Sequence, residues 1–204
     1  MTTAKKLSVC LMMVLLTVIF VGCSFPSRPF LNIEYRFFIA TGTSMEPTIS
    51  EDIGLVRIRL TQDVQHGDIV VYRHYNYLGA NSNRIGRFDY HMKRVIALGG
   101  DVLAFKLFGY VPQYNFLTST NDVFLNGELL DESGFVHPST PFEGNYFLQY
   151  TYQDAGFEFI DGKLTLTIPQ GYFFSMGDNR RWSRDGRYYG ATPKANLVGV
   201  WVQD

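Results

Sequence analysis

From about residue 30 onward, the sequence consists of short β-prone runs separated by Gly, Asn and Asp, with almost no helical periodicity. Two of these runs, LVRIRL (55–60) and LTLTI (164–168), alternate apolar and polar residues, which is typical of half-buried strands. Four more continuously apolar runs predict buried strands, and they span residues 68–72, 94–98, 171–176 and 197–202. The pattern predicts a mostly β fold of antiparallel sheets.

A further β signal lies in the middle of the chain. The run VFLNGELL (123–130) places Asn-Gly between two apolar segments, which predicts a hairpin with a two-residue turn. The stretch from Phe105 to Leu164 is rich in aromatic and turn residues. We therefore expect residues 105–164 to form a β subdomain that is inserted between two strands of the core.

The N-terminus has the pattern of a membrane segment. Lys5 and Lys6 precede nineteen uncharged residues, 7–25, which as a helix would be about 28 Å long and would just cross a bilayer. The two lysines favour a cytoplasmic location for residues 1–6. The sequence thus predicts one N-terminal transmembrane helix, with residues 26–204 as an extracytoplasmic domain.

Two other interpretations of this segment stay open. FVGC (20–23) resembles the lipobox of bacterial lipoproteins, in which Cys23 would be lipidated, although Phe20 departs from the usual leucine. A cleaved secretion signal is the second, because the apolar run is short and ends in small residues. All three interpretations place the domain outside the cytoplasm.

Composition excludes several classes of ligand. The formal net charge of the 204 residues is -1 and the pI is about 6.4, so no basic field favours a nucleic-acid partner. Both cysteines, Cys10 and Cys23, belong to the N-terminal apolar stretch. A disulfide within the domain and cysteine-ligated zinc are therefore excluded.

Ser44, in TGTSMEPTI (41–49), is either a turn residue or a nucleophile that needs a base. A Ser-His-Asp triad is compatible with the spacing, but nothing local favours it, and no histidine has metal-binding spacing on a predicted helix. The alternative base is a lysine kept neutral by burial. Lys93 fits, because it precedes the apolar run Val95 to Leu98.

Four segments together resemble the type I signal peptidases, which are membrane-bound Ser/Lys serine proteases. GTSMEPT (42–48) resembles the nucleophile box and GDIVVYR (67–73) the strand that follows it. MKRVIALGGD (92–101) is similar to the box of the general-base lysine, and MGDNRRWSRDGRYYG (176–190) to the last signature box. With the N-terminal segment, the resemblance covers most of the chain except about residues 105–165.

The resemblance implies a role for individual residues. Ser44 would be the nucleophile and Lys93 the general base, and Ser183 would hydrogen-bond to Lys93 and orient it. Asp185 and Arg187 would form an ion pair beneath the site. No cofactor or metal is implied.

The last signature box also admits simpler interpretations. Gly177 and Asp178 would form a tight turn against the active site, whereas a calcium loop is disfavoured because an arginine occupies the third position. Four arginines predict a solvated face that could contact anionic lipid, namely Arg180, Arg181, Arg184 and Arg187.

A few positions depart from the family pattern. Gly42 stands where many relatives carry a serine whose hydroxyl binds the oxyanion, so backbone N–H groups, above all that of Ser44, would have to serve. Gly99 replaces a common proline and Gly186 a common serine, and Trp182 replaces a common asparagine. These changes bear on loop rigidity more than on chemistry.

The implied function is cleavage of signal peptides from exported preproteins at the bacterial cytoplasmic membrane, after small residues at the first and third positions before the cut. Apolar pockets near Met45 would receive these side chains, and the peptide would pair with a strand edge. Phe30, Tyr35, Phe37 and Phe38 would lie at the membrane surface or in a buried first strand. Two alternatives are a specialised pilin-processing or conjugation peptidase and an inactive lipid-anchored assembly protein.

Overall fold

The computed structural model describes residues 34–76, 87–111, 116–136, 146–148 and 156–203. The predicted anchor 7–25, Cys23 and Phe30 lie outside these residues. Among the helices of the described residues, none has the length and apolar character needed to cross a membrane.

The larger sheet has seven strands, and every neighbouring pair in it is antiparallel. Its spatial order is β1 (Tyr35–Ile39), β2 (Leu55–Arg59), β13 (Leu197–Val202), β3 (Ile69–Asn76), β4 (Arg87–Leu98), β11 (Tyr172–Met176) and β12 (Thr192–Pro193). The C-terminal strand β13 thus lies between β2 and β3.

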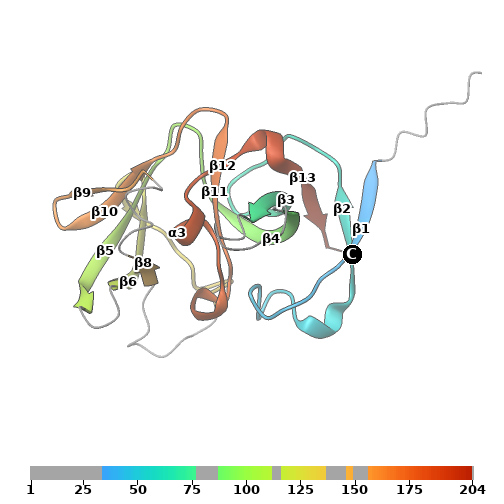
Figure 1. Ribbon diagram of the computed structural model, residues 1–204, viewed down its shortest axis with the longest axis horizontal. Coiled ribbons are helices and arrows are strands. Elements are labelled where there is room, and N and C mark those ends of the chain that lie inside the picture. The colour runs from blue at the N-terminus through green and yellow to red at the C-terminus, as the bar shows by residue number, and fades with distance from the viewer. Residues whose placement is uncertain (1–33, 77–86, 112–115, 137–145, 149–155, 204) are drawn as a thin grey trace, which may run out of the picture. The chain divides into compact units, whose positions relative to one another are not determined.

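The second sheet is formed entirely by chain that lies between β4 and β11, a span that includes the predicted insertion (Figure 1). Its spatial order is β7 (Glu128–Leu129), β6 (Phe116–Leu125), β5 (Val102–Val111), β10 (Lys163–Thr167) and β9 (Glu158–Ile160), and β8 (Tyr146–Leu148) also pairs with β6. These pairs are antiparallel as well.

Helical structure is sparse in the described residues, and its longest element has four residues. The elements are η1 (Glu51–Ile53), η3 (Arg180–Trp182), α3 (Gly186–Tyr189) and η4 (Lys194–Asn196). The predicted mostly β, antiparallel fold is confirmed.

The apolar runs that predicted strands lie in β2, β3, β4, β10, β11 and β13. The Asn-Gly hairpin is also present, since Leu125 pairs with Glu128 across a two-residue loop. Asn126 and Gly127 have φ angles of 53° and 88°. Two consecutive positive φ angles define the turn that Asn-Gly favours, because its twist matches that of the strands.

One hydrophobic core joins the two sheets. Ile96 on β4 and Phe174 on β11 pack in the same cluster as Phe105 on β5 and Leu164 on β10. Phe174 and Phe105 have ring centroids 6.3 Å apart. The second sheet therefore shares its core with the strands that flank it in sequence.

Strand β1 forms one edge of the larger sheet. Phe37 is 61% exposed and Tyr35 is also exposed, while Phe38 is partly buried. The alternative of a buried first strand is wrong for Tyr35 and Phe37, which lie on an exposed face of β1. Phe38 lies on the opposite face and packs against a buried cluster of the larger sheet.

Strand β13 contacts β2 too closely to accept a side chain at Gly199. A Cβ there would overlap the backbone carbonyl of Arg59. We predict that Gly199→Ala lowers the free energy of unfolding by about 1–3 kcal/mol, as overpacking of a dense core does. Chemical denaturation followed by circular dichroism measures this, and Gly134→Ala is the control because its Cβ would meet no atom within 4 Å. Equal stability of the two variants would contradict the β13–β2 packing.

Candidate active site

Ser44 lies in the compact turn that connects β1 to η1. The carbonyl of Thr43 accepts a hydrogen bond from the N–H of Glu46 at 3.1 Å, and that of Met45 accepts one from the N–H of Ile49 at 2.9 Å. Met45 and Ile49 are buried against Ile69 of β3, which anchors the turn to the larger sheet. These contacts fix the position of the Ser44 side chain beside β4.

Lys93 lies in the middle of β4 and pairs with Val70 of β3. Its side chain is buried, with 5% exposure. The Nζ atom donates a hydrogen bond to Ser44 Oγ at 2.8 Å and another to the carbonyl of Met92 at 2.8 Å. The two predicted catalytic residues are therefore in direct contact, although they are 49 positions apart.

The surroundings of Lys93 favour its neutral form. Burial is the main cause and lowers the pKa of Lys93 from 10.5 to about 8. The negative charge of Asp185 raises this pKa and the positive charge of Arg187 lowers it, so that the two partly offset each other. With a pKa of about 8, about a tenth of Lys93 is uncharged at pH 7, whereas an ordinary lysine is almost wholly charged there, and a general base must be in its uncharged form.

A cavity of about 590 Å³ opens onto this pair. Its lining includes Ser44, Lys93 and Met45, together with His91 and Tyr189. Burial lowers the pKa of His91 to about 4. Of the three histidines in the described part of the chain, none hydrogen-bonds to Ser44, whose Oγ instead receives Lys93.

Asp185 and Arg187 form a buried ion pair close to this site. Arg187 Nε donates to Asp185 Oδ1 and Nη2 to Oδ2, both at 2.9 Å, and neither residue is more than 1% exposed. Asp185 also accepts from the N–H of Gly177 at 2.9 Å. Burial is the largest single influence and raises the pKa of Asp185, but the charge of Arg187 and the hydrogen bonds to the carboxylate together outweigh burial, so that the pKa is lowered.

Ser183 is near the dyad, but the predicted hydrogen bond to Lys93 is absent from the described residues. Ser183 Oγ is buried and has no hydrogen-bond partner there. A Cβ on Gly177 would overlap both Ser183 and the carbonyl of Ser44, which shows how closely these segments pack. The orienting role of Ser183 stays a prediction.

We call residues 177–179 the signature turn, and residues 42–49, which include Ser44, the nucleophile turn. The signature turn binds the nucleophile turn directly. Asn179 donates from its backbone N–H to the carbonyl of Ser44 at 3.2 Å and from Nδ2 to that of Thr43 at 3.1 Å. Thr48 Oγ1 donates to Asp178. The predicted tight turn at Gly177 and Asp178 thus lies against Ser44.

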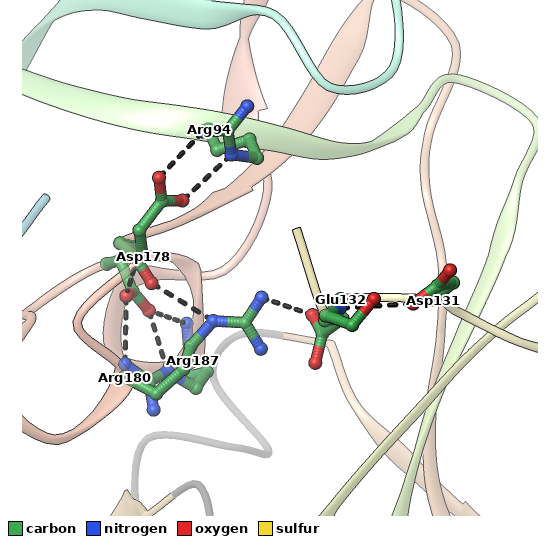
Figure 2. A network of polar contacts seen from close by, with 9 residues as sticks. Arg94, Asp131, Glu132, Asp178, Arg180 and Arg187 are labelled. Atoms are coloured by element: carbon green, nitrogen blue, oxygen red, sulfur yellow. Dashed lines mark hydrogen bonds and ion pairs between the residues drawn. The ribbon is translucent and has the colours of Figure 1, made fainter. Parts of the chain in front are cut away.

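Arg94, next to Lys93 in the sequence, holds the signature turn from β4. Its Nε and Nη2 donate to the two carboxylate oxygens of Asp178 at 2.8 and 2.7 Å (Figure 2). Arg94 Nη1 also donates to the carbonyl of Gly67 at 2.8 Å. Lys93 and Arg94 point to opposite faces of β4, so that one strand positions both the base and the turn that holds the nucleophile.

The predicted solvated face of arginines is wrong for two of its four members. Arg180 and Arg187 are 3% and 1% exposed, and each is paired with a carboxylate, Arg180 with Glu132 and Arg187 with Asp185. Burial of a guanidinium requires such a partner. Only Arg181 and Arg184 are exposed to solvent.

The departures from the family pattern have structural correlates. Gly42 has a φ angle of 85°, a conformation in which a side chain costs roughly 1–2 kcal/mol, and this favours glycine there. A Cβ on Gly186 would collide with the ring of Phe174, and one on Gly99 with the carbonyl of Pro169. Trp182 is 65% exposed.

Comparison with known proteins assigns the family. A model of the signal peptidase, peptidase S26, family matches residues 7–203. The chain belongs to this family. The predicted type I signal peptidase family is thereby confirmed, and its relatives differ from this chain at most positions.

Three curated relatives illustrate the distance. The probable signal peptidase I-2 of Synechocystis is 27% identical over 177 residues, which cover 83% of this chain and 64% of that protein. Signal peptidase I V of Bacillus subtilis is 25% identical over 82% of each chain. Signal peptidase IB of Staphylococcus aureus is 26% identical, over 78% of this chain and 71% of its own.

A solved structure is also similar. The crystal structure of a signal peptidase I from Enterococcus faecalis matches 69% of this chain and 97% of its own, with 22% identity and a TM-score of 0.39.

Several residues of the site could not be predicted from the sequence. Arg94 is next to Lys93, so strand alternation predicts that its side chain points to the opposite face of the strand. Its pairing with Asp178 could be predicted only if the position of the last box relative to that strand were known. Thr48 and Asn179 lie inside the quoted boxes, but they carry no charge that would single them out. Glu132 had no sequence signal, because it belongs to the region that the resemblance does not cover.

The lowered pKa of Lys93 predicts a specific pH dependence of stability. Between about pH 8 and 10.5 the unfolded chain binds a proton that the folded chain lacks at Lys93, so stability rises with pH. Across this range, the free energy of unfolding of the wild type should rise by about 3 kcal/mol relative to that of Lys93→Met.

Urea unfolding of both proteins below pH 8 and above 10.5 measures this gain. Lys106→Met, which removes an exposed lysine, controls for general effects of charge. Parallel stability curves for the wild type and Lys93→Met would show that Lys93 is an ordinary lysine.

Proposed function

We propose that this member of the signal peptidase family is a serine endopeptidase that cleaves signal peptides from exported preproteins, with Ser44 as nucleophile and Lys93 as general base. The observation that carries the proposal is the 2.8 Å contact between Lys93 Nζ and Ser44 Oγ in a buried site. A serine hydroxyl needs an adjacent base, and a lysine can be one only when its ammonium is destabilised.

The first step transfers one proton and forms one bond. Neutral Lys93 accepts the hydroxyl proton while Ser44 Oγ attacks the scissile carbonyl carbon, whose oxygen takes the negative charge. The carbonyl of Met92 accepts an N–H of Lys93 at 2.8 Å, which supports a fixed direction for the lone pair. General base catalysis of this kind contributes about 10²–10⁴-fold.

The next steps restore the enzyme. The tetrahedral intermediate collapses, the carbon–nitrogen bond breaks, and the Lys93 ammonium donates its proton to the leaving amine. The signal peptide is then held as an ester on Ser44. A water that loses a proton to neutral Lys93 attacks this ester, and the proton returns to Ser44 Oγ as the carboxylic acid leaves.

Stabilisation of the oxyanion would fall to the backbone. In the described part of the chain, the backbone N–H of Ser44 donates no hydrogen bond to a backbone carbonyl. It is therefore suited to donate to the developing oxyanion, which is usually the largest electrostatic contribution to acyl transfer. Gly42 supplies no hydroxyl, so that the conformation of the nucleophile turn matters more here.

Substrate recognition would use the cavity and the sheet edge. Met45 and Ile49 contribute apolar lining beside Ser44, which suits small side chains such as alanine at the first and third positions before the cut. Strand β1 is an edge strand, and Ile39 at its end lines the cavity together with residues 40–42, which follow the strand. An extended peptide could pair there by strand addition.

Membrane attachment through residues 7–25 belongs to the same proposal, with the domain on the extracytoplasmic side. Exposed Phe37 and Ile39 on β1 are compatible with contact at the membrane surface. The intact mass of membrane-extracted protein distinguishes an uncleaved anchor from a chain that begins at lipidated Cys23.

The proposal predicts the outcome of a preprotein assay. Detergent-solubilised protein should convert an exported preprotein into its mature form, with a new N-terminus after a small residue. Ser44→Ala and Lys93→Ala should each reduce the rate by about a thousandfold or more, because members of a catalytic pair act as a unit. Gel analysis with N-terminal sequencing of the product gives the rate and the cleavage position.

One control and three outcomes discriminate between the alternatives. Lys106→Ala, at an exposed lysine, should cleave like the wild type. Full activity of Lys93→Ala would refute the dyad. A wild type that cleaves only pilin precursors would be a specialised processing peptidase, and one that cleaves nothing would be an inactive assembly protein.

A further inference from the structure

The loop of residues 130–136, which we call the support loop, leads out of the second sheet toward the active site. It begins next to the core, where the N–H of Leu130 donates to the carbonyl of Val123 at 2.8 Å. The carbonyl of Glu132 then accepts hydrogen bonds from the N–H groups of Phe135 and Val136, at 3.2 and 3.0 Å. One turn therefore fixes Glu132 and Phe135 relative to each other.

Each of these two residues contacts an arginine that holds the signature turn. Glu132 pairs with Arg180 Nη2, and Arg180 Nε donates to the carbonyl of Gly177 at 3.0 Å. The ring of Phe135 lies under the guanidinium of Arg94, 4.4 Å from its centroid. Figure 2 shows Arg94 directed at Asp178, and Glu132 beside the arginines of the last box.

The signature turn in turn holds the nucleophile. Asn179 binds the carbonyls of both Thr43 and Ser44, and Asp178 accepts from Thr48. A continuous series of contacts thus leads from the second sheet through buried Arg180 and partly buried Arg94 to the backbone of Ser44. Catalytic rates are sensitive to such supports, since a displacement of about 1 Å can reduce them by about 10²-fold.

We propose that the support loop is a positioning element for Ser44, with Glu132 and Phe135 as positioning residues that act through Arg180, Arg94 and the signature turn. This inference rests on the proposed endopeptidase activity. It assigns the second sheet a part in catalysis, although neither Glu132 nor Phe135 lines the cavity beside the dyad. Neither Glu132 nor Phe135 touches the reacting atoms, so they are not catalytic residues.

The buried Arg180–Glu132 pair is the more sensitive member of the two contacts. The side chains of Arg180 and Glu132 are 2% and 11% exposed, and Arg180 Nη1 has no hydrogen-bond partner among the described residues. Loss of the Glu132 charge would leave a buried guanidinium uncompensated, which forces it to move toward solvent. Arg180 would then no longer be fixed against the carbonyl of Gly177.

The test compares two carboxylates that are adjacent in sequence. Glu132→Gln should lower kcat by about 10- to 100-fold with little change in KM, because the substrate cavity is untouched. Asp131→Asn is the matched control, since Asp131 is exposed and its hydrogen bonds come from Ser133 and not from an arginine of the last box. It should retain the wild-type kcat. Rates are measured on a preprotein, well below the unfolding temperature of each variant.

A second variant pair keeps the test decisive if Glu132→Gln does not fold. Phe135→Leu removes the aromatic face under Arg94 and should also lower kcat, whereas Phe135→Trp preserves that face and should restore it. A kcat equal to that of Asp131→Asn in both Glu132→Gln and Phe135→Leu would overturn the inference. An effect on KM alone, or one that disappears at lower temperature as the folded fraction recovers, would overturn it as well.

Failure of this inference is distinct from failure of the proposed function. If the wild type cleaves no preprotein, the endopeptidase assignment is wrong, and if Ser44→Ala cleaves like the wild type, the assignment of Ser44 as nucleophile is wrong. If the wild type cleaves, Ser44→Ala is inactive and Glu132→Gln is fully active, then only the role of the support loop is wrong.

Discussion

The burial of one ammonium group beside one hydroxyl is the constraint on which the rest of the site depends. Burial in an apolar site destabilises the charged form of a lysine, and the pKa of Lys93 is therefore lowered to about 8. The strands around β4 and the nucleophile turn together leave Lys93 only 5% exposed. The chemistry therefore follows from packing, because the same side chain in water would remain protonated.

The pKa of Lys93 also depends on the two opposite charges near it, those of Asp185 and Arg187. Asp185 alone would hold the ammonium charged and defeat its function as a base. The bidentate contact with Arg187 compensates this carboxylate, so that burial remains the dominant influence on Lys93. Asp185 also accepts the N–H of Gly177, and it thereby joins the electrostatics of the base to the geometry of the signature turn.

The site is assembled from segments that are distant in the chain, and each is tied to the next by short polar contacts. The nucleophile turn follows β1, the base lies on β4, and the signature turn follows β11, where a register shift between Phe174 and Ser175 interrupts the pairing with β4. Such irregularities commonly redirect a chain near functional sites. At Gly177, where a Cβ would overlap the carbonyl of Ser44, the signature turn lies too close to the nucleophile turn for a side chain.

The sequence predicts the strands and the dyad far better than the polar framework. Period-two runs and Asn126-Gly127 locate strands because their patterns are local, and Lys93 could be found because an apolar run follows it. The burial of Arg180 is a tertiary property, set by a carboxylate 48 positions away, and nothing near it in the sequence indicates that carboxylate. In the structure, Lys93 donates to Ser44 and to the carbonyl of Met92 rather than to Ser183, and this choice of partners is likewise a tertiary property.

The most direct test of the central claim is the pKa of Lys93 itself. Nuclear magnetic resonance of the lysine side chains in the folded protein, with Lys93 assigned through Lys93→Met, follows this group as the pH is raised. The account predicts a midpoint of about 8. A midpoint near 10.5, the ordinary value for lysine, would contradict it, because Lys93 would then be too strongly protonated to accept the Ser44 proton.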